Sequence, residues 1–177
     1  MWTVWTSLFT FHAFILIVSC QSTCDWPPQY DDLQVRCVCG TGGNLRLTVQ
    51  CSSVELSRLV EALQSKSPLD LISVINGSIA SIEDGTFSGL DVKAIQLSNV
   101  GLSSISPLAF QGLERTLNSL NLEKNELRDV PTQSLKRLTT LKELDLSRNR
   151  LNVIPDAAFS GLALSNLKLS DNALQIR

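Results

Sequence analysis

Few side chains of this sequence could carry out chemistry, and most of them are cysteines near its start. The sequence has a single histidine, His12, and five cysteines. All five lie in the N-terminal part, at Cys20, Cys24, Cys37, Cys39 and Cys51. A serine or cysteine nucleophile needs a neighbouring base, usually a histidine. Clustered cysteines can instead form disulfides, or bind zinc where their spacing suits it.

The first residues predict the compartment and therefore the chemistry of the cysteines. Residues 1–23 contain no Asp, Glu, Lys or Arg, and the run from Leu8 to Val18 is mostly apolar. Its length matches the core of a signal peptide and is short for a transmembrane helix. We predict a signal peptide at residues 1–22 and an extracellular protein, secreted or at the cell surface. Two alternatives stay open: an uncleaved anchor, since a basic residue is missing, and a lipid-modified Cys20 in a loose lipobox.

Removal of this segment would leave no histidine and an even number of cysteines. An even, clustered set in a secreted chain predicts disulfides among Cys24, Cys37, Cys39 and Cys51. Four cysteines allow three pairings, and the sequence does not choose among them. Zinc binding is the alternative, but the Cys-x-Cys spacing without a nearby histidine disfavours it. We therefore expect no Ser-His-Asp or Cys-His catalysis, no enzyme, and no metal or other cofactor.

The rest of the sequence is repetitive. From Leu69 onward, the motif LxxLxLxxNxLxx(I/V) returns every 23 to 25 residues. The repeats start at Leu69, Val92, Leu117, Leu141 and Leu164, which makes four complete repeats and a fifth that is cut short. Such a period indicates a solenoid, in which each unit buries its apolar residues against the next. In each LxL the leucines point inward as in a strand, so the strands of successive repeats should pair in parallel.

Two further motif positions have structural roles. Asparagine at position nine lies where the strand turns away, and its amide can satisfy unpaired backbone groups. This predicts a ladder of Asn125, Asn149 and Asn172, weaker over the first two repeats, where Gly77 and Val100 replace asparagine. Phenylalanines followed two residues later by glycine recur in three repeats. We interpret Phe87, Phe110 and Phe159 as an apolar spine on the convex side rather than a ligand site.

The repeat motif resembles that of the extracellular leucine-rich repeat family, over residues 69–177. The run from Cys24 to Cys51 resembles this family's cysteine-rich N-terminal cap, although twelve residues between its first two cysteines is a longer gap than usual. The resemblance implies an α/β-type solenoid, a horseshoe segment with a parallel sheet on its concave face, which usually binds another protein. It also implies the pairing of Cys24 with Cys39 and of Cys37 with Cys51.

These assignments divide the chain into a signal peptide at 1–22, a cysteine-rich cap with an irregular first repeat at 23–68, and repeats at 69–177. Within the irregular repeat, Ser52 to Glu55 resemble a capping box. The following residues have helical apolar spacing, which predicts a short helix. The apolar positions are Leu56, Leu59, Val60 and Leu63.

The outward strand positions of the third to fifth repeats are the candidate binding residues. They are polar and mixed in charge: Asn121, Glu123, Lys124, Glu143, Asp145, Arg148, Lys168 and Asp171. A net charge of −2 and the absence of a basic stripe exclude nucleic acid as the expected partner. These repeats offer no Trp or Tyr anchor, so we expect weak contacts from them alone. Trp26 and Tyr30 in the cap are predicted to be exposed, unless Trp26 packs on the disulfides.

Asn76, Gly77 and Ser78 form the single N-glycosylation sequon. A glycan at Asn76 is expected to cover one end of the concave face and to leave the third to fifth repeats to a partner.

Two functions fit these features. One is a protein-recognition module of the cell-adhesion or cell-surface receptor type, and the alternative is a secreted structural matrix protein of the small leucine-rich repeat type. The last repeat lacks the polar cover of a finished solenoid. We therefore expect an N-terminal fragment of a longer protein, with end-to-end pairing of subunits as the alternative. Membrane association is expected only through the signal segment or an anchor further downstream.

Overall fold

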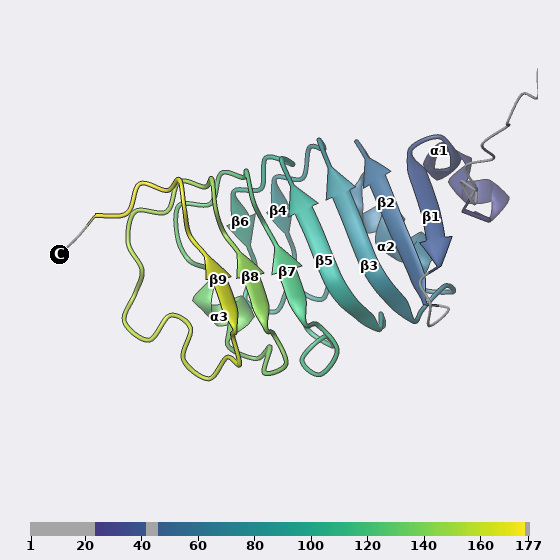
Figure 1. Cartoon of the computed structure of the whole chain (residues 1–177). Helices are drawn as coiled ribbons and strands as arrows, with labels where there is room; N and C mark the ends of the chain where they lie inside the picture. Colours follow the sequence, from purple (N-terminus) through teal and green to yellow (C-terminus); the bar gives the residue numbers. More distant parts are fainter. Residues whose placement is uncertain (1–23, 42–45, 176–177) are drawn as a thin grey trace, which may run out of the picture.

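The computed structural model describes residues 24–41 and 46–175, so the predicted signal peptide, with His12 and Cys20, lies outside the described residues. Within them the chain forms a seven-stranded sheet (Figure 1). In spatial order its strands are β1 (Cys37–Thr41), β2 (Leu47–Ser52), β3 (Leu69–Ile75), β5 (Val92–Ser98), β7 (Ser119–Asn121), β8 (Glu143–Asp145) and β9 (Asn166–Lys168). β1 and β2 are antiparallel, and the later neighbours are parallel. The fold is the predicted parallel-sheet solenoid.

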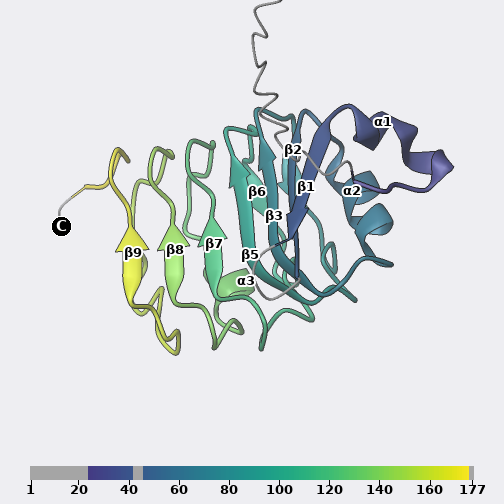
Figure 2. The ribbon, with the colours of Figure 1, turned by 45° about the vertical axis from the view of Figure 1, so that its right-hand side comes forward.

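The remaining elements lie on one side of this sheet or beside its N-terminal edge. Behind the sheet in Figure 1 are α2 (Leu56–Leu63), α3 (Thr132–Leu135), and the two-stranded sheet of β4 (Ser81–Ile82) and β6 (Ser104–Ile105). The short helices η1 (Pro28–Tyr30) and α1 (Asp31–Gln34) lie at the β1 end (Figure 2). We call the side of α2, α3, β4 and β6 the convex side. The opposite face of the sheet, predicted to be concave, is uncovered, and we call it the open face.

The strand register follows the repeat motif. Leu69 is paired with Val92, and Leu120 is paired with Leu144, which in turn is paired with Leu167. The inward leucine is 1% exposed in β7 and β8 but 37% exposed in β9, the last described strand. Each repeat therefore completes the burial of its predecessor's leucines, as expected for a stack of units that cannot bury them alone.

Aromatic packing fills the convex side only in part. The rings of Phe87 and Phe110 stack with centroids 5.8 Å apart and an interplanar angle of 10°. Leu135 occupies the same motif position in the next repeat and is fully buried, whereas Phe159 is half-buried. A leucine thus separates Phe159 from the stacked pair.

Two disulfides close the N-terminal cap. They join Cys24 to Cys39 and Cys37 to Cys51, which is the pairing that the family resemblance implies. The second bridge links paired positions of β1 and β2. β1 thereby covers the edge of β2 that the parallel repeats leave unpaired, and covered edges resist aggregation.

The prediction that Trp26 and Tyr30 are exposed was wrong, since both side chains are buried. Two cations near α2 cover them. The Lys66 ammonium and the Arg58 guanidinium each lie 5.3 Å from a ring centroid, over Trp26 and Tyr30 respectively. The aromatic residues therefore attach the cap insertion to the body of the protein.

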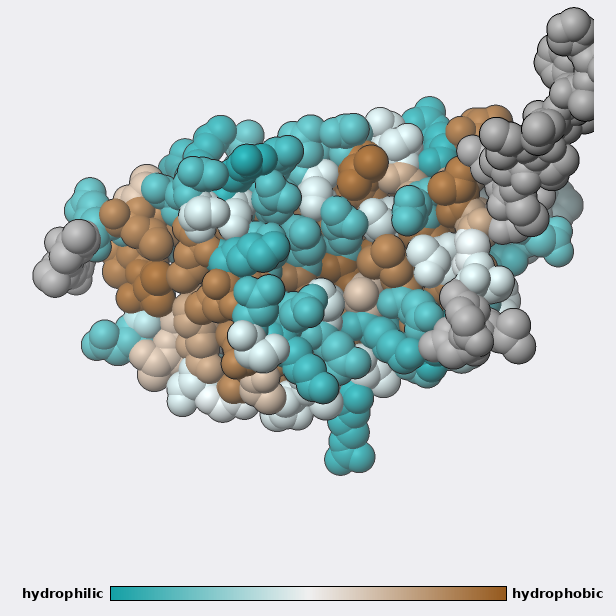
Figure 3. Space-filling view, in the orientation of Figure 1, coloured by the Kyte–Doolittle hydropathy of each residue, from teal (hydrophilic) through white to brown (hydrophobic). Residues whose placement is uncertain are grey.

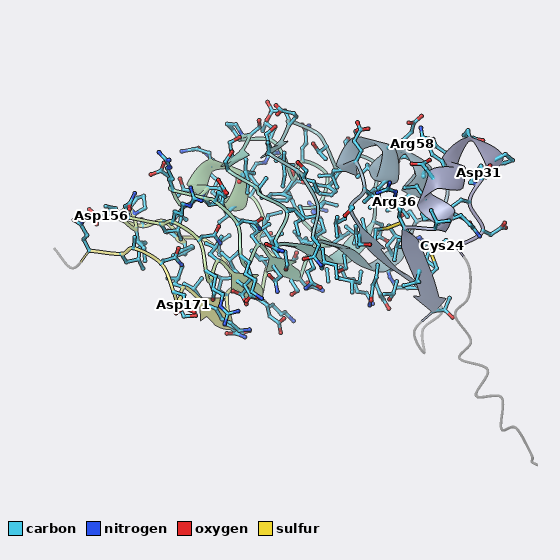
Figure 4. The ribbon with its side chains drawn as sticks, turned by 90° about the horizontal axis from the view of Figure 1, so that it is seen from above. Cys24, Asp31, Arg36, Arg58, Asp156 and Asp171 are labelled. Atoms are coloured by element: carbon cyan, nitrogen blue, oxygen red, sulfur yellow. A yellow bond between two sulfur atoms is a disulfide. The ribbon has the colours of Figure 1, made fainter. Side chains whose placement is uncertain are left out.

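Arg58 also fixes the cap insertion through Asp32. Its guanidinium donates from Nε and Nη2 to the Asp32 carboxylate, with the shortest contact at 2.8 Å. This hydrogen bond holds the pKa of Asp32 below its usual value. In Figure 4 Arg58 lies on the convex side, close to the cap residues Asp31 and Arg36.

The predicted helix after Cys51 is confirmed as α2, but the predicted capping box is wrong. The N-cap residue is Glu55, and no side chain caps the helix. The Glu55 carboxylate instead accepts a hydrogen bond from Ser57 Oγ. Ser52, the residue that would cap the helix in such a box, is instead the last residue of β2. No helix among the described residues is long and apolar enough to cross a membrane.

Candidate functional site

The open face is built from strand residues that alternate with the buried leucines. Its central row, given by the strand register, runs through Val38, Gln50, Ser73, Gln96, Asn121, Asp145 and Lys168. A second row beside it runs through Thr48, Leu71, Ala94, Ser119, Glu143 and Asn166. Side chains that are far apart in the sequence thus form one continuous surface.

Over β1, β2, β3 and β5 both rows lack charged residues, and we call this the uncharged half. The charges of these strands, Asp70 and Lys93, lie outside the rows and pair with each other at 2.9 Å. Hydrogen bonds run along the uncharged half from repeat to repeat: Ser73 Oγ donates to Gln96 Oε1 at 3.1 Å, and Gln96 Nε2 donates to Ser98 Oγ at 3.3 Å. Ser98 Oγ in turn donates to Asn121 Oδ1 at 3.3 Å. Val38 and Ile75 are 46% and 41% exposed on the same half. This half therefore combines fixed polar groups with accessible aliphatic ones.

None of the predicted binding residues lies in this uncharged half except Asn121 at its border, because all of them come from the outward positions of the third to fifth repeats. A signal was present in the strand Leu69–Ile75, where Leu71 and Ile75 fall at outward positions of the motif. Two apolar residues at positions that are polar in later repeats indicate a surface of different character.

The other half, over β7, β8 and β9, is charged and contains the predicted binding residues. Lys168 Nζ lies 3.2 Å from an oxygen of Asp145. Arg148 bridges two carboxylates, with Glu123 at 3.2 Å and Asp171 at 3.3 Å. In Figure 4 Asp171 lies on the sheet side, opposite the helices of the convex side. The structure therefore brings the predicted residues together, and five of them form ion pairs with one another.

Two of the predicted charges have no ion pair with another described residue. Glu143 is exposed and accepts a hydrogen bond from Ser119 Oγ at 3.1 Å. Lys124 is also exposed. Of the charges at this end of the face, these are the ones that a partner could bind without breaking an existing ion pair.

Asp145 is ionised more readily than a free aspartate. Burial raises the pKa of its carboxyl. Hydrogen bonds from Ser147 and Lys168, together with the charge of Lys168, lower this pKa by more than burial raises it, so it lies below the usual value. The Ser147 backbone amide donates to Asp145 Oδ1 at 3.0 Å. The carboxylate thus serves as a fixed acceptor at the centre of the charged half.

In the third to fifth repeats the motif positions seven and eight are not strand residues as predicted, whereas in the first two repeats position seven is the last strand residue, at Ile75 and Ser98. β7, β8 and β9 end at Asn121, Asp145 and Lys168, two residues before position seven. Position eight has a left-handed backbone in every repeat, with φ between 54° and 58°, at Ser53, Asn76, Asn99, Lys124, Arg148 and Asp171. These side chains form the rim of the open face, because a left-handed residue ends the strand and turns the chain towards the convex side.

The asparagines of position nine lie directly beneath this rim. Asn149 Oδ1 accepts from the Leu127 amide at 3.1 Å, and its Nδ2 donates to the carbonyls of Leu122 and Leu146 at 2.9 and 3.1 Å. Asn125 and Asn172 make the equivalent contacts one repeat earlier and later. In the first two repeats an apolar contact takes this place: a Cβ built on Gly77 would lie 3.3 Å from Val100 Cγ1.

Hydrophobic residues gather at the end of the molecule that carries β9, as Figure 3 shows for the open face. Those with more than a third of their surface exposed at this end are Val153, Ile154, Leu167 and Leu174. Among the described residues, no group of three or more His, Cys, Asp or Glu side chains could hold a metal ion.

Comparison with known proteins agrees with this architecture. Residues 115–174 match the leucine rich repeat family. Leucine-rich repeat-containing protein egg-6 of Caenorhabditis elegans is 30% identical over 149 residues, which cover 84% of this chain and 14% of that protein. Tsukushi of Gallus gallus is 36% identical over 86 residues, or 48% of this chain and 23% of that protein.

A solved structure has the same fold. The crystal structure of a TLR13-ssRNA13 complex superposes with a TM-score of 0.60 and 28% identity, covering 66% of this chain and 16% of that one. The present chain spans less than a quarter of the length of each of these three proteins.

Proposed function

This chain is a leucine-rich repeat protein of the extracellular type, and from that premise we propose that it is a non-catalytic protein-recognition module of the cell-adhesion or cell-surface receptor kind. The observation that carries the proposal is the open face. It is a continuous surface that none of the described helices covers, and it receives side chains from every strand of the sheet. Surfaces of this kind are suited to extended contacts with another macromolecule.

A protein is a better partner for this surface than a nucleic acid. The charged half carries four carboxylates, on Glu123, Glu143, Asp145 and Asp171, against three cations, on Lys124, Arg148 and Lys168. Binding to a phosphate backbone requires an excess of cations along a stripe. The solved structure of the TLR13-ssRNA13 complex contains single-stranded RNA, but the mixed-charge surface of the present chain supports a protein ligand.

The compartment in the proposal is extracellular. Two disulfides are typical of chains that fold in an oxidising environment. We retain the signal peptide at residues 1–22, the cap with its irregular first repeat at 23–68 and the repeats at 69–177 as part of the proposal.

In this proposal the eight predicted residues contribute in different ways. The ion pairs of Arg148 and Lys168 fix the shape and local charge of the surface, and Asn121 holds the hydrogen-bond chain that connects its two halves. Glu143 and Lys124 are the charges available to a partner. Charged groups at the edge of an interface mainly set its specificity and its association rate.

A binding screen with a matched pair of variants tests the proposal. The full chain, joined to an antibody Fc domain to raise avidity, is applied to a panel of extracellular proteins and to cells. Lys124→Glu on the rim is compared with Lys136→Glu, the same change on the convex side next to α3, where Lys136 is exposed. We expect Lys124→Glu to weaken binding about tenfold and Lys136→Glu to leave it unchanged.

If Lys136→Glu weakened binding as much as Lys124→Glu, or more, the partner would not use the open face. Surface labelling of cells that express the full-length protein then separates the two extracellular roles. Retention at the cell surface supports an adhesion or receptor role, and release into the matrix supports the structural one.

A further inference from the structure

Asn76 lies at the rim of the open face with its backbone fixed on both sides. Its φ is 54°, its carbonyl accepts from Ser53 Oγ at 2.8 Å, and its amide donates to the Ser98 carbonyl at 3.3 Å. Its side-chain Oδ1 accepts from Asn99 Nδ2 at 2.7 Å. Its own Nδ2 makes no hydrogen bond within the described part of the chain, so this nitrogen is held in place and is free to react.

The sequon is also accessible at its other end. Asn76 and Ser78 are both exposed, and Gly77 between them is half-buried against Val100. The turn thus places both the asparagine amide and the serine hydroxyl on the surface, so the fold can accommodate a glycan on Asn76.

A groove begins at these two residues and leads away from the open face. Asn76 and Ser78 line a hollow of ≈ 370 Å³ together with Ser53, Val54, Glu55 and Gly77. Glu55 and Ser78 also line a second hollow of ≈ 310 Å³, which reaches Ser57 at the start of α2 and Ser81 and Glu83 at β4. Both α2 and β4 lie on the convex side (Figure 1).

The lining of this groove suits a carbohydrate. Glu55 and Glu83 are exposed carboxylates that can accept hydrogen bonds from sugar hydroxyls, and Ser57 and Ser81 place hydroxyl groups beside them. Ala80, which is exposed and lines the second hollow, offers an apolar surface to a sugar ring. Polar groups that fix orientation on an apolar floor are typical of ligand sites.

We infer that Asn76 carries an N-linked glycan whose first sugars lie in this groove on the convex side, so that the open face stays clear. The inference rests on the proposed extracellular role, because only a secreted chain meets the modifying enzyme. In the modification, Asn76 Nδ2 attacks the anomeric carbon of an oligosaccharide linked to a lipid diphosphate. The new N–C bond forms, Nδ2 loses one proton, and the lipid diphosphate leaves with the electrons of the broken C–O bond.

This placement changes the role expected of the glycan. From the sequence, a glycan at Asn76 is expected to cover one end of the concave face and to leave only the later repeats to a partner. A glycan directed towards α2 and β4 leaves the uncharged half, with Ile75 and Gln96, accessible as well. The partner surface would then extend over both halves of the open face.

The modification is tested on the full chain, expressed in a eukaryotic secretory host and translated in parallel with microsomes. Peptide-N-glycosidase should shift the mobility of the wild type. Asn76→Gln and Ser78→Ala should remove this shift, and Ser78→Thr, which preserves the sequon, should retain it. A secreted, disulfide-bonded chain without a shift would overturn the inference and leave the proposed function intact. A chain that enters neither the host's secretory pathway nor the microsomes would contradict both the proposed function and the inference that rests on it.

The placement is tested by carbodiimide labelling of carboxylates in the wild type and in Ser78→Ala. We expect several-fold slower labelling of Glu55 and Glu83 in the glycosylated protein, with Glu126, an exposed carboxylate in a later repeat, unchanged as the control. A glycosylated protein in which Glu55 and Glu83 react as fast as in Ser78→Ala would overturn the placement in the groove.

Discussion

Substitution of Asn149 by alanine measures what the asparagine ladder contributes to stability. Its side chain accepts one hydrogen bond from the Leu127 amide and donates to the carbonyls of Leu122 and Leu146. Both carbonyls keep a second donor in the variant, since Asn125 Nδ2 also bonds to Leu122 and Asn172 Nδ2 also bonds to Leu146. The buried amide of Leu127, in contrast, loses its side-chain acceptor.

These contacts set the expected magnitude. An orphaned buried amide costs about 1–3 kcal/mol, and each of the two lost bonds to shared carbonyls costs about 0.5–1.5 kcal/mol at most. We expect Asn149→Ala to lower the free energy of unfolding by about 3 kcal/mol. Asn166→Ala, which removes an exposed asparagine from β9, should change it by less than about 0.5 kcal/mol and serves as the control.

The ladder also predicts an order among its three members. Asn125 Oδ1 accepts from two buried amides, those of Val100 and Leu102, so Asn125→Ala should cost more than Asn149→Ala. Asn172 is half-exposed, and water can replace part of its bonds, so Asn172→Ala should cost less. Guanidinium-induced unfolding, monitored by circular dichroism with the disulfides intact, gives the free energy of unfolding of these three variants and of the control. A cost for Asn149→Ala no larger than that of the control, or a reversed order, would refute the role assigned to these asparagines.

Four further variants test the cap, the convex side and the charged half. Replacing both Cys37 and Cys51 by serine should lower stability by about 3 kcal/mol, since the bridge closes a loop of 14 residues; an unchanged melting temperature would count against the cap as a stabilising element. Phe110→Ala, in the stacked pair, should cost about 3–5 kcal/mol, and Phe159→Ala, which is half-buried, should cost clearly less in the same unfolding assay. Because the pKa of Asp145 lies below its ordinary value of 3.8, its carboxylate stabilises the fold above that pH, and this contribution is lost as the pH falls through the lower folded-state value. Asp145→Asn should therefore lose less stability than the wild type between about pH 4 and pH 2, and identical pH profiles would contradict the assignment.

The repeat motif predicted the fold because each of its apolar positions has the same environment in every unit. Leu69 and Val92 were predicted as repeat starts, and they are the first residues of β3 and β5. The register of later strands follows from the same spacing, since stacking units can only bury their leucines when equivalent positions align. The helix α2 was likewise readable from its apolar spacing alone.

The rim of the open face was not predicted, because the left-handed turn depends on backbone geometry that Lys124 and Arg148 do not reveal. A signal was available in the other repeats. Asn76, Asn99 and Asp171 occupy the same position, and Asn and Asp are the side chains that most readily adopt a positive φ.

The burial of Trp26 and Tyr30 could not be predicted from the cap alone. Their cover comes from Lys66 and Arg58, which lie 40 and 28 residues further along the chain. When the cation and the aromatic ring are this far apart along the chain, their contact depends on the fold that brings them together, so no local sequence pattern predicts it. The ion pairs that neutralise most of the predicted binding residues are hidden from the sequence for the same reason.

The central claim is that the open face binds a protein partner. The structure of the full chain in complex with a partner from the binding screen tests it most directly. We expect the partner to bury the central row, including Gln96, Asn121 and Asp145, and to leave α3 and the rest of the convex side exposed. A partner seated on α3 or the outer surface of the cap, with the central row still open to solvent, would contradict the claim.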